Sequence, residues 1–231
     1  MPLDTVSFAW QSMAVNQHAA GQHLEVIRTL MERSAIYRRA LAPNMLMLGG
    51  VGIAAGLIGY FVPIEGSRRF AAYWLCISIG ALAASYLNMR REALREHEPF
   101  WSPPTRRVTQ ALAPALFVGA VFGLATAISP WSILLVPPSL LAGEPAWQLP
   151  PVWMLLYGAA IHAAGFFMPR GFKLFGWGYI ITGTLVLLGL SRLHSGASLR
   201  FGHLLMAIAF GGAHLAYGAY LSITERSRGD A

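Results

Sequence analysis

Three histidines lie within long apolar stretches and are the residues best placed to do chemistry in this chain. His162 lies in the stretch 151–168, and His203 and His214 both lie in the stretch 201–223. An ionisable side chain inside an apolar span is costly, which makes it a candidate functional residue. At 100° per residue, eleven residues bring His203 and His214 to nearly the same helix face, together with Ala207, Gly211 and Gly218. We expect both histidines to project from this one face of the last span.

His162 and His214 could act as the two axial ligands of a b-type haem. Both lie on faces of small residues, which predicts that they point into a helix bundle. Two neutral imidazoles can hold haem iron, and the positions of these two residues in their stretches give compatible depths. The alternative is hydrogen bonding across helices, which is the more common role of histidine in a bundle. No carboxylate or thiolate accompanies them, so we predict no metal-ion site.

The apolar stretches contain no Asp, Glu, Lys or Arg. Ion-coupled transporters and proton relays place such residues at mid-membrane, so their absence argues against a coupled pump. It argues less against a passive pore, which backbone and hydroxyl groups can line. The motifs HExxH, GxSxG and the P-loop are also missing. The sequence therefore favours a protein that is not an enzyme, without deciding the question.

The elements that must position these histidines are membrane helices. The chain has 231 residues, of which 55% are hydrophobic and only 12% charged; soluble domains carry about 25% charged residues. We predict an all-α polytopic membrane bundle of six transmembrane helices in residues 41–231, preceded by a segment 1–40 with an amphipathic helix at 24–39. The six predicted spans are 44–62, 70–89, 108–128, 151–168, 174–190 and 201–223.

Glycines on one side of the first span predict close helix packing. Gly49, Gly52, Gly56 and Gly59 follow one another at helical spacing, which lets two backbones approach closely in lipid. Such a face would serve packing within the chain and a homo-oligomer equally well. Residues 129–150 are apolar but rich in proline, which a straight spanning helix does not tolerate. We favour an interfacial loop there, and a re-entrant lid over a cavity is the alternative.

The basic residues predict the topology. Thirteen of the lysines and arginines fall on one side of the six spans and four on the other, so the positive-inside rule places both termini in the cytoplasm. We attribute the net charge of +7 to the loops between membrane spans, and we therefore expect no nucleic-acid binding. Five arginines surround the loop after the second span and should face anionic lipid headgroups: Arg90, Arg91, Arg95, Arg106 and Arg107.

The stretches LLYGAAIHAAGFFMPRGFKLFGWGYIITGTLVLL (155–188) and AIAFGGAHLAYGAYLSITERSRGD (207–230), with LMERS (30–34), resemble a family of uncharacterised bacterial six-span membrane proteins. In that family an LYGAG span is followed by a short basic turn, a glycine-bearing span, and a last span with GFGGLHI and a basic tail. The turn MPRGFK departs from the family, whose turn is closer to SVR. The resemblance implies a location in a bacterial inner membrane and a protein partner, since winged-helix regulators neighbour the family. It implies no particular reaction.

These observations predict a non-enzymatic membrane protein that senses, anchors or regulates together with a cytosolic regulatory protein. An uncoupled transporter or channel for a small neutral solute or lipid is the alternative. A haem-bearing electron-transfer subunit built on His162 and His214 is the third hypothesis.

Overall fold

A computed structural model describes residues 41–97, 99–129, 145–168, 170–189 and 198–229. Within these ranges every regular element is a helix and there is no β-strand. Five helices are long and apolar enough to cross a membrane, which suggests a multi-pass membrane protein. They are Leu41–Phe61, α2 (Ser67–Arg95), α3 (Pro103–Ile128), Gly171–Gly189 of α5 (Arg170–Gly189), and Leu199–Thr224, which combines α6 (Leu199–Met206), the π-helical segment η3 (Ala207–Gly212) and most of α7 (Ala213–Gly229).

The fourth predicted span is shorter than expected. Helix α4 (Leu149–Ala164) has 16 residues, or about 24 Å at 1.5 Å per residue, against about 30 Å of hydrocarbon. It ends at Ala164 because the chain turns there, through Gly165, toward α5. The 3-10 helix η2 (Pro145–Gln148) directly precedes α4 and adds about 8 Å at about 2 Å per residue. Only the two elements together reach the length of a span.

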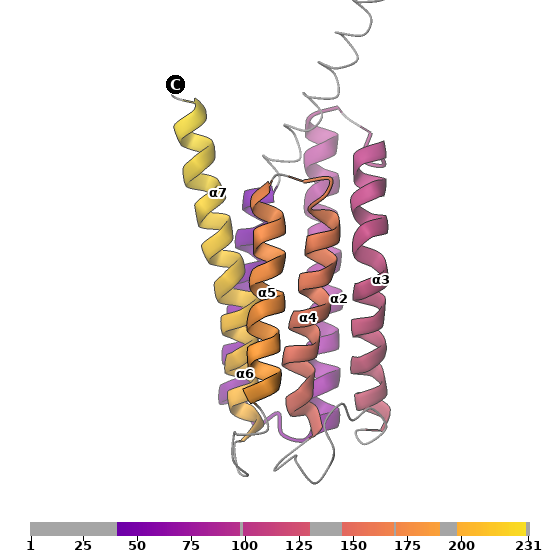
Figure 1. Ribbon diagram of the computed structural model, residues 1–231, viewed down its shortest axis with the longest axis vertical. Coiled ribbons are helices and arrows are strands. Elements are labelled where there is room, and N and C mark those ends of the chain that lie inside the picture. Colours follow the sequence, from indigo (N-terminus) through magenta and orange to yellow (C-terminus); the bar gives the residue numbers. More distant parts are fainter. Residues whose placement is uncertain (1–40, 98, 130–144, 169, 190–197, 230–231) are drawn as a thin grey trace, which may run out of the picture. The chain divides into compact units, whose positions relative to one another are not determined.

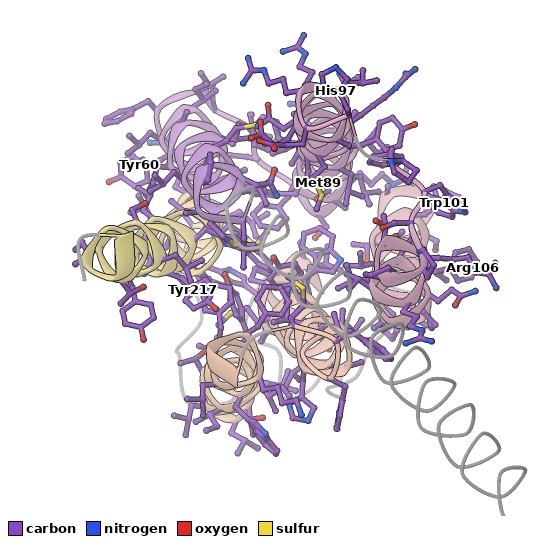
Figure 2. The ribbon with its side chains drawn as sticks, turned by 90° about the horizontal axis from the view of Figure 1, so that it is seen from above. Tyr60, Met89, His97, Trp101, Arg106 and Tyr217 are labelled. Carbon is purple, nitrogen blue, oxygen red and sulfur yellow. The ribbon has the colours of Figure 1, made fainter. Side chains whose placement is uncertain are left out.

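Each helix packs against the helices before and after it in the chain. Helix α2 packs against α3, α3 against α4, and α4 against α5. Asn44 donates to Ser85 between the first helix and α2, at 2.8 Å, and the Tyr179 hydroxyl donates to the Ala209 carbonyl between α5 and η3. Since the helices Leu41–Phe61 and Leu199–Thr224 also pack together, the six form a closed ring (Figures 1 and 2).

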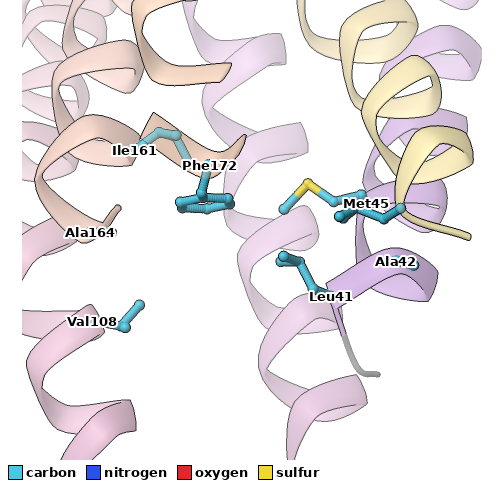
Figure 3. Close-up of a cluster of buried hydrophobic side chains, with 8 residues drawn as sticks. Leu41, Ala42, Met45, Val108, Ile161, Ala164 and Phe172 are labelled. Carbon is cyan, nitrogen blue, oxygen red and sulfur yellow. The ribbon is translucent and has the colours of Figure 1, made fainter. Parts of the chain in front are cut away.

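Two clusters of buried apolar side chains lie at the two opposite ends of the helix bundle. The first joins the start of the first helix and of α3 to the end of α4 and the start of α5, and Figure 3 shows Leu41 and Met45 directed toward Phe172. We call this the Leu41 end. The second joins the start of α2 to η2 and the start of α6, through Phe70, Leu149 and neighbours. We call this the Gly66 end, after the residue that precedes α2.

The predicted glycine face of the first helix is confirmed, and it lies against the last span. Four contacts follow one another along the two helices: Gly59 with His203, Gly56 with Ala207, Gly52 with Gly211, and Gly49 with Leu215. A Cβ atom on Gly52 would lie 2.8 Å from the Gly211 Cα atom. Ordinary carbon contacts lie at about 3.5–4.0 Å. The two backbones can approach this closely only because glycine has no side chain.

Two predictions concern residues outside the described ranges. The amphipathic helix predicted at 24–39 lies entirely outside them, and so do residues 130–144 of the proline-rich segment. The described end of that segment is η2, whose Ala146 is fully buried and donates its backbone N–H to the Ser67 hydroxyl at 3.1 Å. Pro150 and Pro151 occupy the first turn of α4, where a missing N–H costs no helical hydrogen bond.

Candidate functional site

His214 lies at the centre of a buried cluster of polar and aromatic side chains. Only 3% of its surface is exposed. Its Nε2 atom lies 2.6 Å from the Tyr157 hydroxyl of α4, and its Nδ1 atom lies 3.1 Å from the Tyr179 hydroxyl of α5. The rings of Phe175 and Phe210 complete the surroundings, with Phe175 edge-on to the imidazole at 5.4 Å. Three helices therefore meet at this one imidazole.

The hydrogen bonds of this cluster run in one direction. The Tyr179 hydroxyl donates its only hydrogen to the Ala209 carbonyl, at 2.6 Å. Its oxygen is then the acceptor for His214 Nδ1–H, which leaves Nε2 as the acceptor for the Tyr157 hydroxyl. The donors are, in order, Tyr157, His214 and Tyr179, and the last acceptor is the Ala209 carbonyl. Every hydrogen has a partner, so the cluster is a satisfied structural network.

The π-helical segment η3 decides which way His214 points. The residues of the last span that contact the glycines of the first helix are spaced four apart: His203, Ala207, Gly211 and Leu215. Each step of four over-rotates a straight α-helix by about 40°, or about 120° over three steps. One additional residue in a wide turn removes about 100° of this and keeps the contacts in line. His214 is displaced by the same rotation, toward α4 and α5.

His203 belongs to a second cluster, at the Gly66 end. It is fully buried. The Trp74 indole N–H donates to its Nδ1 atom at 3.1 Å, so Nε2 carries the hydrogen and donates to the Ile64 carbonyl at 3.2 Å. The Phe70 ring lies 4.7 Å from the imidazole. His203 therefore faces the first helix and α2, whereas His214 faces α4 and α5; the prediction that they share one helix face assumed a straight helix, and η3 lies between them.

His162 lies on a different side of α4 from the His214 cluster. Five residues separate it from Tyr157, which is about 140° around the helix. Its ring is edge-on to Phe166 and Trp177, which are 66% and 48% exposed. His162 itself is half-buried, and its Nδ1 atom has no hydrogen-bond partner among the described residues. It therefore faces the outer surface of the α4–α5 pair, and its predicted inward direction holds only in part.

These positions bear on the haem hypothesis. Among the described residues, His162 and His214 contact different side chains, and iron could reach His214 Nε2 only by displacing the Tyr157 hydroxyl. Haem ligation stays a prediction, which oxidised and dithionite-reduced absorption spectra of the purified protein would test. In the described ranges no three His, Cys, Asp or Glu side chains are grouped so that they could hold a metal ion.

The five arginines predicted to face headgroups all lie at the Leu41 end and are all exposed. They occupy the last two turns of α2 and the first two turns of α3. At the same end the Lys173 ammonium lies 3.7 Å from the centre of the Phe166 ring. The grouping of these residues on one side, inferred from the order of the spans, agrees with the fold.

Sequence reasoning missed the partners of the histidines. Tyr157, Tyr179 and Trp74 lie in three different helices, and no local spacing links them to His203 or His214. The only sequence signal is that a tyrosine or tryptophan deep in an apolar span needs a partner for its O–H or N–H group. The π-helical segment has no signal of its own, since it arises from the contact between two helices.

Comparisons of the chain with protein-family models, with curated proteins and with solved structures found no match. The functional conclusion therefore depends on the residues of this chain.

Proposed function

We propose that this protein is a non-enzymatic, multi-pass component of a bacterial inner membrane that anchors or regulates a cytosolic partner. One observation carries the proposal: the polar side chains at the two internal histidines bond to one another, while the charged side chains lie at the exposed ends. His203 and His214 are buried and their ring nitrogens all have partners, which suits a scaffold better than a path for a substrate.

The proposed topology has six spans with both termini in the cytoplasm. The sixth span is the combination of η2 and α4, which packs between α3 and α5 as the spanning helices do. The Leu41 end carries the larger number of basic residues, so the positive-inside rule assigns it to the cytoplasm. Cysteine-accessibility labelling of intact cells at Glu96 and Glu65 would check the assignment, because these exposed residues lie at opposite ends.

The partner would be reached from the Leu41 end. Helix α2 has 29 residues, or about 43 Å, which exceeds the hydrocarbon core by about 13 Å. Its last turns therefore extend into or beyond the headgroups and expose Leu94 (65%) next to charged Arg95 and Glu96. The resemblance to a family that neighbours winged-helix regulators points to the same kind of role.

A crosslinking experiment in intact cells tests this proposal. A photoreactive amino acid at Glu96 would lie at the end of α2, whereas the same group at Leu82 (56% exposed) would lie in the middle of that helix and face lipid. We expect a protein adduct of defined mass at Glu96 and none at Leu82, with the partner identified by mass spectrometry. Equal adducts at both positions, or none at Glu96, would contradict the proposal.

A swelling assay on proteoliposomes distinguishes this proposal from the hypothesis of an uncoupled channel. Vesicles with the purified protein should swell in isotonic glycerol at the same rate as empty vesicles. A swelling rate that increases with the amount of protein would favour the channel instead.

A further inference from the structure

We propose that the junction of α2 and α3 is a binding surface for the headgroups of anionic phospholipids. The surface, which we call the basic collar, consists of five arginines and three aromatic residues: Arg90, Arg91, Arg95, Arg106, Arg107, Tyr86, Phe100 and Trp101. The inference goes beyond the proposed function, because it assigns a ligand to this end of the bundle whether or not a protein partner exists.

Five arginines and the glutamates Glu92, Glu96 and Glu98 lie between residues 90 and 107, so this segment has a net charge of +2. All five arginines are exposed. The only ion pair that one of them makes with a described residue joins Arg95 to Glu92, at 3.6 Å on the surface. The first turn of α3 contains no acidic residue, although the positive end of the helix dipole lies there. Arg106 and Arg107 add two positive charges to this helix end, and a phosphate group is the anion that fits such an arrangement.

The aromatic residues place the collar at headgroup depth. Tyr86 and Phe100 are in edge-to-face contact at 5.0 Å, and Trp101 follows Phe100 with 58% of its surface exposed. Tyrosine and tryptophan are enriched at this level of a membrane, where one side of the ring meets lipid and the other meets water. Arg90 directly follows the apolar part of α2, so its guanidinium lies at the same boundary.

On α3 the collar points outward, where lipid would surround the protein. Figure 2 shows Trp101 and Arg106 on the outer side of α3, directed away from the other helices. The neighbouring Val108 is buried in the cluster of the Leu41 end, which fixes the rotation of α3 about its axis. Exposed arginines beside exposed aromatic rings on the outer side of two neighbouring helices fit a layer of anionic headgroups.

The Gly66 end has fewer exposed arginines than the collar. Arg68 and Arg69 are exposed at the start of α2, but Arg200 pairs with Glu65 at 3.3 Å, so the charge there is partly compensated. The described residues at that end include three arginines, against five in the collar. Arg68 and Arg69 therefore provide a matched control for Arg106 and Arg107, since both are adjacent exposed pairs near the start of a helix.

A lipid titration of the full-length protein in detergent tests the inference. Fluorescent short-chain phosphatidylglycerol should bind more tightly than phosphatidylcholine, and the preference should weaken from 50 to 500 mM NaCl. A basic residue near an anionic surface contributes about fivefold. The double variant Arg106→Gln/Arg107→Gln should then bind phosphatidylglycerol about 25-fold more weakly, while Arg68→Gln/Arg69→Gln should change binding less than about threefold. Inorganic phosphate at 10 times the lipid concentration should not compete, which distinguishes a lipid from free phosphate.

Three results would overturn the inference. They are equal binding of both lipids, an equal loss in the two double variants, and unchanged binding in Arg106→Gln/Arg107→Gln. If that variant does not fold, Arg90→Gln/Arg91→Gln removes two collar charges from α2 and carries the same expectation. Thermal unfolding of each variant checks the fold.

Discussion

The contact between the first and last spans can be tested with two glycines of one helix. Gly52 is buried against Gly211, and a Cβ atom there would lie 2.8 Å from the Gly211 Cα and N atoms. Gly50, two residues earlier, is exposed and has no atom within 4 Å of such a Cβ. The substitutions Gly52→Ala and Gly50→Ala therefore add the same methyl group to the same helix in opposite environments.

The structure gives the expected magnitude. At Gly52 the two helices must separate by about 1 Å to restore an ordinary carbon contact, and overpacking of this kind costs about 1–3 kcal/mol. Alanine at either position gains about 0.5–1 kcal/mol in helix propensity. The two variants should thus differ by about 1–3 kcal/mol, with Gly52→Ala the less stable. In a chain of this size that corresponds to about 2–12 °C in the midpoint of thermal unfolding.

Fluorescence-detected size-exclusion chromatography of heated, detergent-solubilised samples measures these midpoints. Gly50→Ala should unfold at or slightly above the temperature of the unsubstituted protein, and Gly52→Ala clearly below it. If the two variants have the same midpoint, the close approach of Leu41–Phe61 to the last span is refuted. A larger loss in Gly50→Ala would refute it as well.

Three further predictions use the same measurement. Tyr157→Phe leaves the buried Nε2 atom of His214 without a donor and should cost about 1–2 kcal/mol, or about 2–8 °C; an unchanged midpoint would mean that the Tyr157 bond contributes nothing. Trp74→Phe removes the donor to His203 Nδ1 and should lower the midpoint by a similar amount, and a rise would contradict the assigned hydrogen bond. Arg200→Gln breaks only a surface ion pair of about 0–1 kcal/mol, so its midpoint should fall by less than about 4 °C.

Much of the architecture could be predicted from hydropathy and glycine spacing. The apolar stretches determine which segments are helical, because a backbone in hydrocarbon must satisfy its hydrogen bonds internally. The seam from Gly49 to Gly59 was predictable because a run of glycines on one face has few other uses in a spanning helix. The end of α4 was not, since Ala164 is followed by residues just as apolar and the turn depends on packing against α5.

The candidate site was predictable only by residue type. The sequence indicated that the histidines matter, because an ionisable group in an apolar span needs a partner. It could not indicate which partner, since Tyr157 and Tyr179 come from helices that meet His214 only in the folded chain. It also placed His203 and His214 on one face, and the π-helical segment between them separates the two.

The amino-acid sequence by itself determined the all-helical class of the fold, the stretches that form its apolar helices, and the end of the bundle at which the basic residues gather. These properties are local, since each depends on the composition of a single stretch and on the order of the stretches along the chain. Only the tertiary structure decided what the histidines contact. The register of the glycine seam forces a wide turn into the last span, and the resulting rotation turns His214 from the first helix toward two tyrosines. Such a rotation comes from packing between helices, which no single stretch of sequence contains.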